Sequence, residues 1–161
     1  MSLPISSLGT IILNPSFSQW VTDKCVWIAV NIIGYCLYAD SAIPVAGLAL
    51  MIAMSIHLLY MLLYLRLMKF TITDQQIMYN HGVFNRKREF IELYRVVDFH
   101  EDVSFLQNIF DIKTVTIHSG DRTTPRLKIP GIPLGYPLVQ TLRERVEYNK
   151  RRKGIYEITN R

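Results

Sequence analysis

Three adjacent basic residues, Arg86, Lys87 and Arg88, lie in a polar turn between two segments that are predicted to be strands. Positive side chains at a hairpin tip can bind phosphate groups, and near a membrane each contributes about 1 kcal/mol of attraction to anionic headgroups. The alternative interpretation is a solvated turn whose charges only mark the cytoplasmic side of a membrane. The sequence leaves both open, so these residues are a candidate binding site for lipid or for a protein partner.

Nucleic acid fits these charges less well. Proteins that bind single strands place aromatic side chains among the basic residues, so that bases can stack on them. The aromatic residues of this sequence do not alternate with its basic residues in that way. The sequence therefore argues against nucleic acid as a partner.

The group His100, Glu101 and Asp102 holds side chains that often serve as metal ligands or acid–base catalysts. A simpler interpretation is a solvated charged loop in which Asp102 caps a short helix through residues 103–107. The sequence has no metal-binding spacing of Cys and His, no P-loop, no dinucleotide-binding motif and no catalytic serine motif. We therefore predict no catalytic residues, no metal and no cofactor, and expect that the protein is not an enzyme.

Two apolar segments determine where these groups lie. Residues 45–65 contain no formally charged side chain, and a helix of about 20 such residues can cross the hydrocarbon core of a bilayer. Residues 26–39 form a shorter apolar run, which residues 20–25 can extend. A polar turn at residues 40–43 separates the two, and Pro44 suits the first position of the second helix. The pattern predicts an antiparallel transmembrane hairpin.

The distribution of Lys and Arg predicts the orientation of this hairpin. Lys24 precedes the first segment, whereas Arg66 and Lys69 follow the second. The turn between the segments carries Asp40 and no basic residue. Because cytoplasmic loops are enriched in Lys and Arg, both termini are expected in the cytoplasm.

Polar and small side chains within the two segments are candidates for helix packing. Asn31 and Ser55 fall at a similar depth, so a hydrogen bond between the helices is expected. A proton or ion pathway is the alternative, but it usually needs acidic groups or several histidines, and these segments hold His57 alone. Small residues allow close approach of helices, within the pair or with another protein. They are Gly34, Ala46, Ala49 and Ala53.

The region from residue 66 onward has a different character. It carries 17 Lys and Arg against 11 Asp and Glu, a net charge of +6, which predicts an acidic neighbour such as anionic lipid. Apolar residues alternate with polar ones in several short runs, for example at Phe70 and Ile72 or at Val115 and Ile117. This period of two predicts six or seven short strands.

A final amphipathic helix is predicted after Pro137. Leu138, Leu142 and Val146 recur every four residues and form its inward face. The residues expected to face outward are Arg143, Glu144, Arg145 and Glu147. We predict that this helix closes the open end of a small bent β-barrel or sandwich.

Short motifs follow the two apolar segments in a fixed order: a T-x-x-x-I strand, a Gly-hydrophobic pair, a polar hairpin, an R-V strand, a short helix and a T-V-x-I-x-S strand. Their positions here are Thr73, Ile77, Gly82, Val83, Arg95, Val96, Leu106, Val115 and Ser119. This order resembles the membrane-flanked bacterial pleckstrin-homology-like (PH-like) family, in particular its members with two spans before the domain. The resemblance implies an α+β fold with a PH-like barrel and no enzymatic activity.

The predicted organisation has four parts: an N-terminal segment (residues 1–19), a two-helix transmembrane hairpin (20–66), a cytoplasmic PH-like domain (67–150) and a basic tail (151–161). The favoured function is a non-enzymatic, membrane-anchored module that scaffolds or binds a protein partner, or a second copy of itself, at the cytoplasmic face of a bacterial inner membrane. The alternative is recognition of anionic lipid headgroups by the basic face of the domain. A third option is a small transporter or an accessory subunit of an enzyme.

Overall fold

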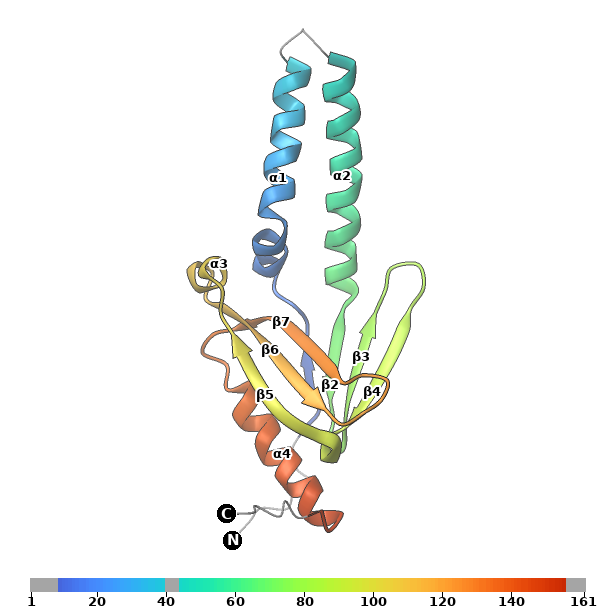
Figure 1. Cartoon of the computed structure of the whole chain (residues 1–161), viewed down its shortest axis with the longest axis vertical. Helices are drawn as coiled ribbons and strands as arrows, with labels where there is room; N and C mark the ends of the chain where they lie inside the picture. Colours follow the sequence, from blue (N-terminus) through green and yellow to red (C-terminus); the bar gives the residue numbers. More distant parts are fainter. Residues whose placement is uncertain (1–8, 40–43, 156–161) are drawn as a thin grey trace.

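The computed structural model describes residues 9–39 and 44–155. Two long helices stand side by side on a domain made of two antiparallel sheets and a C-terminal helix (Figure 1). The predicted turn between the helices, at residues 40–43, lies outside the described residues. Most of the predicted basic tail, from residue 156 onward, lies outside them as well.

The long helices are α1 (Phe17–Ala39) and α2 (Pro44–Leu67). Each is long and apolar enough to cross a membrane, and little of either is buried inside the protein. They indicate that the chain associates with a membrane. The helices pack closely because glycines face the neighbouring backbone: a Cβ atom on Gly34 would lie 3.1 Å from the backbone nitrogen of Met51, and one on Gly47 would overlap the backbone of Tyr38.

In the described part of the chain, the domain has seven strands in two sheets, with the orders β1-β2-β3-β4 and β5-β6-β7. The first sheet contains β1 (Ile11–Leu13), β2 (Lys69–Ile72), β3 (Gln76–His81) and β4 (Lys87–Glu92). A 3-10 turn, η2 (Leu93–Arg95), leads to the second sheet, which contains β5 (Val96–Asp102), β6 (Ile112–Ser119) and β7 (Arg126–Pro133). Among the described residues no ladder joins the sheets, because the chain turns a corner at η2, so the predicted barrel is not closed.

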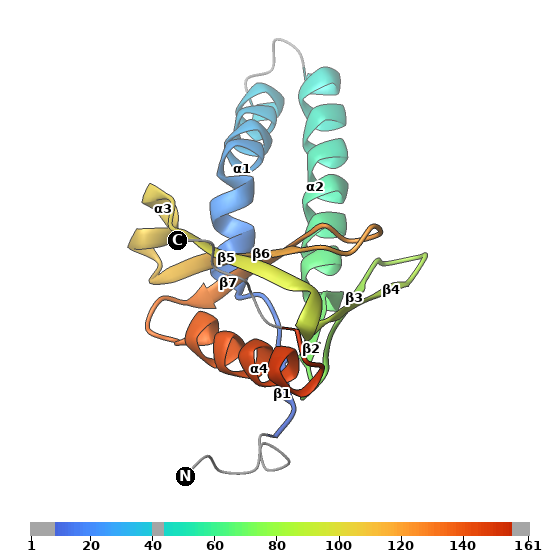
Figure 2. The same cartoon turned by 60° about the horizontal axis from the view of Figure 1, so that its bottom comes forward.

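Both sheets share one core with the C-terminal helix, α4 (Leu138–Arg152). Phe70 in β2 and Ile117 in β6 point inward and have no exposed surface, as the alternation of polar and apolar residues predicts. Leu138 and Leu142 of α4 are also fully buried, and Val146 is 4% exposed. Figure 2 shows α4 lying across the end of the sheets that faces away from α1 and α2. The predicted closing helix and its apolar face are confirmed.

The segment before α1 is fastened to both sheets. β1 pairs with β2, with Ile12 opposite Thr71. The amide of Ser16 donates a hydrogen bond of 3.2 Å to the carbonyl of Gly131 in β7. Gly131 has a φ of +69°, and a Cβ atom there would lie 2.7 Å from the Ser16 nitrogen, so only glycine allows this crossing.

The short helix α3 (Phe105–Ile109) is capped at its N-terminus by Ser104 and not by Asp102. The Ser104 hydroxyl accepts a hydrogen bond from the amide of Gln107, and the Gln107 side chain accepts one from the Ser104 amide, which makes a capping box. Asp102 instead ends β5, opposite Thr114. The predicted cap at Asp102 is wrong because the strand ladder continues through that residue.

Arg145 faces the core, and the prediction that it faces outward is wrong. Its side chain is 2% exposed. Nη2 donates to the carbonyl of Gly9 at 2.8 Å, and Nη1 donates to the carbonyl of Thr73 at 3.1 Å and lies 3.9 Å from the carboxylate of Asp74. The guanidinium can be buried because its Nη1 and Nη2 groups are hydrogen-bonded to these backbone carbonyls, which themselves require donors. Arg145 therefore fastens α4 to both the N-terminal segment and the β2–β3 turn.

Candidate functional site

The basic hairpin is formed by β3, β4 and the turn at residues 82–86. Gly82 opens the turn with a φ of +106°, where a Cβ atom would overlap the carbonyl oxygen of Asn85. Arg86, Lys87 and Arg88 are all exposed. Because successive strand residues point to opposite faces, Lys87 and Arg88 project on different sides of the hairpin.

This hairpin rises beside the lower end of α2 (Figure 1). The ring of Phe84 at its tip stacks on Tyr60 with centroids 6.2 Å apart, and His81 meets Tyr64 at 6.4 Å. Phe84 is nevertheless 90% exposed. The structure thus brings the predicted basic residues close to the end of the second apolar helix.

Two open grooves flank the basic residues. One, of 640 Å³, lies on the outer face of the sheet and is lined by Lys69, Arg86 and Arg88. There the Arg88 Nε atom donates to the Asn80 side-chain oxygen at 3.0 Å, which holds the guanidinium over the strand. The other, of 360 Å³, lies between the hairpin and α2 and combines the apolar Phe84 with Lys87. Both grooves are large enough for a phosphate group with its substituents.

Under the hairpin lies an aromatic cluster whose role is structural. Tyr79 stacks on Phe70 at 4.7 Å and on His81 at 4.4 Å. The His81 Nε2 atom is 4.0 Å from the carboxylate of Glu89. Burial, assisted by the neighbouring Tyr64, raises the pKa of Tyr79 above its ordinary value. Its hydroxyl therefore stays protonated at neutral pH.

A third groove runs between β5 and α4. Strand β5 is one of the two outer strands of its sheet and pairs with β6 alone in the described structure. The groove has a volume of 450 Å³, and its lining includes Val97 and Phe99 from β5 and Val146 from α4. Val97 is 69% exposed, and the Phe99 amide donates to the Asp98 carboxylate at 2.7 Å. The sequence analysis did not identify this groove, because period-two alternation does not reveal which strand lies at a sheet edge.

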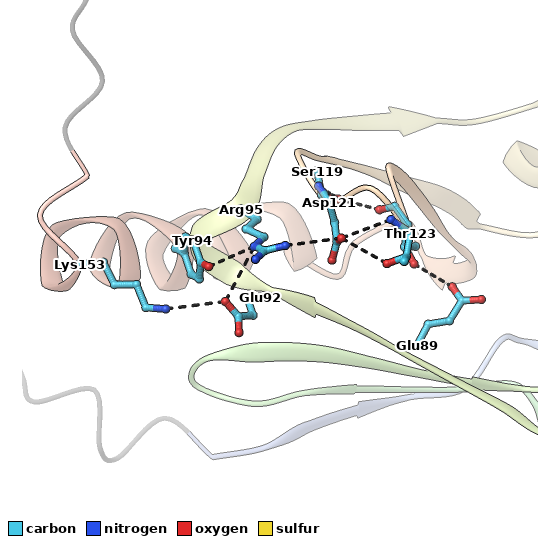
Figure 3. Close-up of polar contacts among 9 residues, drawn as sticks. Glu89, Glu92, Tyr94, Arg95, Ser119, Asp121, Thr123 and Lys153 are labelled. Carbon is cyan, nitrogen blue, oxygen red and sulfur yellow. Dashed lines mark hydrogen bonds and ion pairs between the residues drawn. The ribbon is translucent and has the colours of Figure 1, made fainter.

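A polar network ties the corner at η2 to the neighbouring elements (Figure 3). Glu92 lies 3.7 Å from the ammonium of Lys153, and Arg95 lies 3.6 Å from the carboxylate of Asp121 in the β6–β7 turn. The hydrogen bond from the Tyr94 hydroxyl, with the charges of Lys153 and Arg95, lowers the pKa of Glu92. The network connects β4, the β6–β7 turn and the end of α4, so we assign it a structural role.

Within the helix pair, the structure brings Asn31 and Ser55 together: the Asn31 amide donates to the Ser55 hydroxyl at 3.0 Å and to the carbonyl of Met51 at 3.1 Å. His57 packs on the ring of Trp27 with centroids 5.4 Å apart. Gly34 is buried at the contact with α2. The remaining small residues, all exposed on α2, are Ala46, Ala49 and Ala53.

The acidic and histidine residues near α3 do not converge. His100 pairs with Asp102 at 3.2 Å, and Glu101 pairs with Lys113 at 2.8 Å. Residues 9–39 and 44–155 contain no group of three or more His, Cys, Asp or Glu side chains that could hold a metal ion. His100 and Asp102 form an exposed surface pair, whereas Glu101 binds the ammonium of Lys113, whose side chain is only 6% exposed.

Comparison with known protein families gives one match. Residues 26–150 match the family model described as the bacterial PH domain. This chain belongs to the bacterial PH domain family. In this PH domain protein the matched region includes most of α1, all of α2 and the domain almost to the end of α4. Comparisons with curated proteins and with solved structures found no match.

Proposed function

We propose that this PH domain protein is a membrane-anchored, non-enzymatic module that binds an extended segment of a protein partner along β5. The observation that carries the proposal is the groove between the outer strand β5 and helix α4. An extended segment can add to a sheet edge through backbone hydrogen bonds, while pockets beside the edge select its alternate side chains. The exposed Val97 offers such a segment an apolar contact.

The position of α4 supports this proposal, because one wall of the groove is held in place without a partner. Arg145 and Leu142 hold the helix against the first sheet and the core. A groove with fixed walls loses little conformational freedom on binding, which favours affinity.

The proposed location is the cytoplasmic face of a bacterial inner membrane, with both termini in the cytoplasm. The domain lies at the end of the helix pair that carries Arg66, and Arg66 stacks over the ring of Phe17 at 5.9 Å. The basic hairpin lies at the same end. This accumulation of positive charge supports a cytoplasmic domain.

Site-specific photo-crosslinking in native membranes tests the binding proposal. A photoreactive residue in place of Val97 should give a discrete adduct, whereas one in place of Glu144, exposed on α4 and outside the groove lining, should not. The adduct should map to a short segment of a partner, or of a second copy of this chain, and Val97→Asp should release that partner. Equal, diffuse labelling from both positions would refute the proposal.

Recognition of anionic lipid is a second candidate function, supported by the position of Arg86, Lys87 and Arg88 beside α2. Replacing all three by Gln should weaken retention of phosphatidylglycerol by the purified full chain, by up to about 3 kcal/mol for three charges. Native mass spectrometry of parent and variant measures the retained lipid. Raised salt should have the same effect on the parent, since the Debye length is about 8 Å at physiological ionic strength. Equal retention by the two proteins would exclude this role.

A further inference from the structure

Two exposed apolar groups lie on opposite sides of the helix pair, where the domain meets it. One is the tip of the basic hairpin, with Phe84 90% exposed. The other is α3, where Phe105 is 80% and Ile109 60% exposed. These two are four residues apart and so share one face of the helix. In Figures 1 and 2, α3 lies beside α1 and the hairpin lies beside α2, on the far side of the pair.

The register of the helix pair gives the depth of the hairpin tip. Asn31 lies opposite Ser55 and Trp27 lies opposite His57, so Lys24, which precedes the apolar run of α1, lies at about the height of Tyr60 in α2. Phe84 stacks on Tyr60. A lysine at the end of a span places its ammonium among the headgroups. Phe84 therefore lies at the boundary between headgroups and hydrocarbon.

Hydrogen bonds set the depth of α3. The Gln107 amide nitrogen of α3 donates to the Gln19 side-chain oxygen at 2.8 Å, and this contact is buried. The Gln19 amide nitrogen donates in turn to the carboxylate of Asp23 at 2.8 Å. Gln19 lies four residues before Asp23, about 6 Å along the helix axis. The first turns of α1 thus hold α3 within the headgroup layer, one turn below the level of Lys24.

We infer that Phe84 on one side, and Phe105 with Ile109 on the other, insert into the bilayer that the helix pair crosses, so that the domain is held against the membrane at two points. This inference rests on the proposed membrane anchoring. The molecule that contacts these groups is lipid, because a bilayer surrounds the helix pair on all sides. It therefore reaches both apolar groups at once, although they lie on opposite sides of the pair. The basic residues next to Phe84 favour anionic headgroups. Two acids near α3 are paired, Glu101 with Lys113 and Asp102 with His100, whereas Asp111 is exposed just after the helix.

Fluorescence quenching of the full chain in lipid vesicles tests the inference. In a background with Cys25 and Cys36 replaced by Ala, single cysteines at Phe84 and Phe105 carry an environment-sensitive nitrobenzoxadiazole label. Vesicles contain phosphatidylcholine and phosphatidylglycerol, and no other protein. Controls are Ile56→Cys, 64% exposed in the middle of α2, and Glu144→Cys, exposed on α4. The labels at 84 and 105 should show blue-shifted emission, loss of iodide quenching, and quenching by a nitroxide near the lipid headgroup.

The controls separate the possible failures. Iodide access at 84 and 105 equal to that at 144, with Ile56 protected, overturns the inference and leaves the anchoring intact. Protection at only one of the two positions overturns the two-point contact. If the protection from iodide disappears when the protein is diluted in lipid, a second copy of the chain covers these positions. That result also overturns the inference. Iodide access at Ile56 refutes the proposed anchoring itself, and the inference with it.

Discussion

Substitution of Arg145 by Met is expected to be among the most damaging single changes in the domain. Methionine keeps an unbranched apolar stem but cannot donate to the carbonyls of Gly9 and Thr73, which lie 2.8 and 3.1 Å from the guanidinium. Hydrogen bonds from charged groups contribute about 1.5–3 kcal/mol each, and removing one partner of a buried ionic contact costs about 3–5 kcal/mol. We therefore expect a loss of about 3–5 kcal/mol, a large share of the 5–15 kcal/mol typical of a domain.

The matched control is Arg143→Met, two residues earlier on the exposed face of α4, which should change stability by no more than about 0.5 kcal/mol. Thermal unfolding of the full chain in detergent, followed by circular dichroism, should show a melting temperature lower by at least about 12 °C for the Arg145 variant alone. In the Arg145 variant, the amides of α4 and of the β2–β3 turn should lose protection from hydrogen exchange. Equal melting shifts for the two variants would refute the assignment of Arg145 to the core.

Four further outcomes are expected. Leu142→Ala should destabilise the domain by about 2–5 kcal/mol, measured by the same unfolding assay, because the side chain is fully buried. Glu92 has a pKa below its ordinary 4.5, so the stability that its ionised carboxylate contributes is complete above about pH 4.5 and disappears as the pH falls through the lowered pKa. The melting temperature of the Glu92→Gln variant should therefore depend less on pH in that acid range. Ala49→Leu, at an exposed position of α2, should disrupt assembly with a partner or a second copy, measured by sizing in mild detergent, without preventing insertion. A reporter fused to the C-terminus should be cytoplasmic, and one inserted between α1 and α2 periplasmic.

The fold could be predicted largely because its strongest signals are local. The two apolar runs and the alternation at Phe70 and Ile72 depend on sequence neighbours alone, and the structure follows them. The error at Arg145 has a different cause. With about 100° per residue, Arg145 falls about 20° beyond Leu138, at the edge of the face formed by Leu138, Leu142 and Val146, so a full helical projection would have placed it beside the inward face. The prediction that Arg145 faces solvent followed from its residue type alone.

Long-range features could not be derived in the same way. Closure of a barrel depends on whether distant strand edges meet, and the corner at η2 keeps the two sheets apart. The groove beside β5 likewise exists because α4 returns to that edge from the end of the chain. The contact of Gln107 with Gln19 joins residues 88 positions apart, and neither glutamine carries a local signal for it. Sequence reasoning found the basic hairpin, but only the structure places it against α2.

The attachment of the domain to the helix pair bears directly on how such a module would act. A flexible linker would leave a binding groove free to turn relative to the membrane, whereas here α2 passes into β2 with a single residue, Met68, between them. On the other side, α1 is fastened through the Ser16 amide to Gly131 and through Gln19 to Gln107. Two connections on opposite sides of the pair prevent the domain from rotating about either helix. A partner bound along β5 would then be held at a fixed height and angle to the bilayer, which is what a membrane scaffold requires.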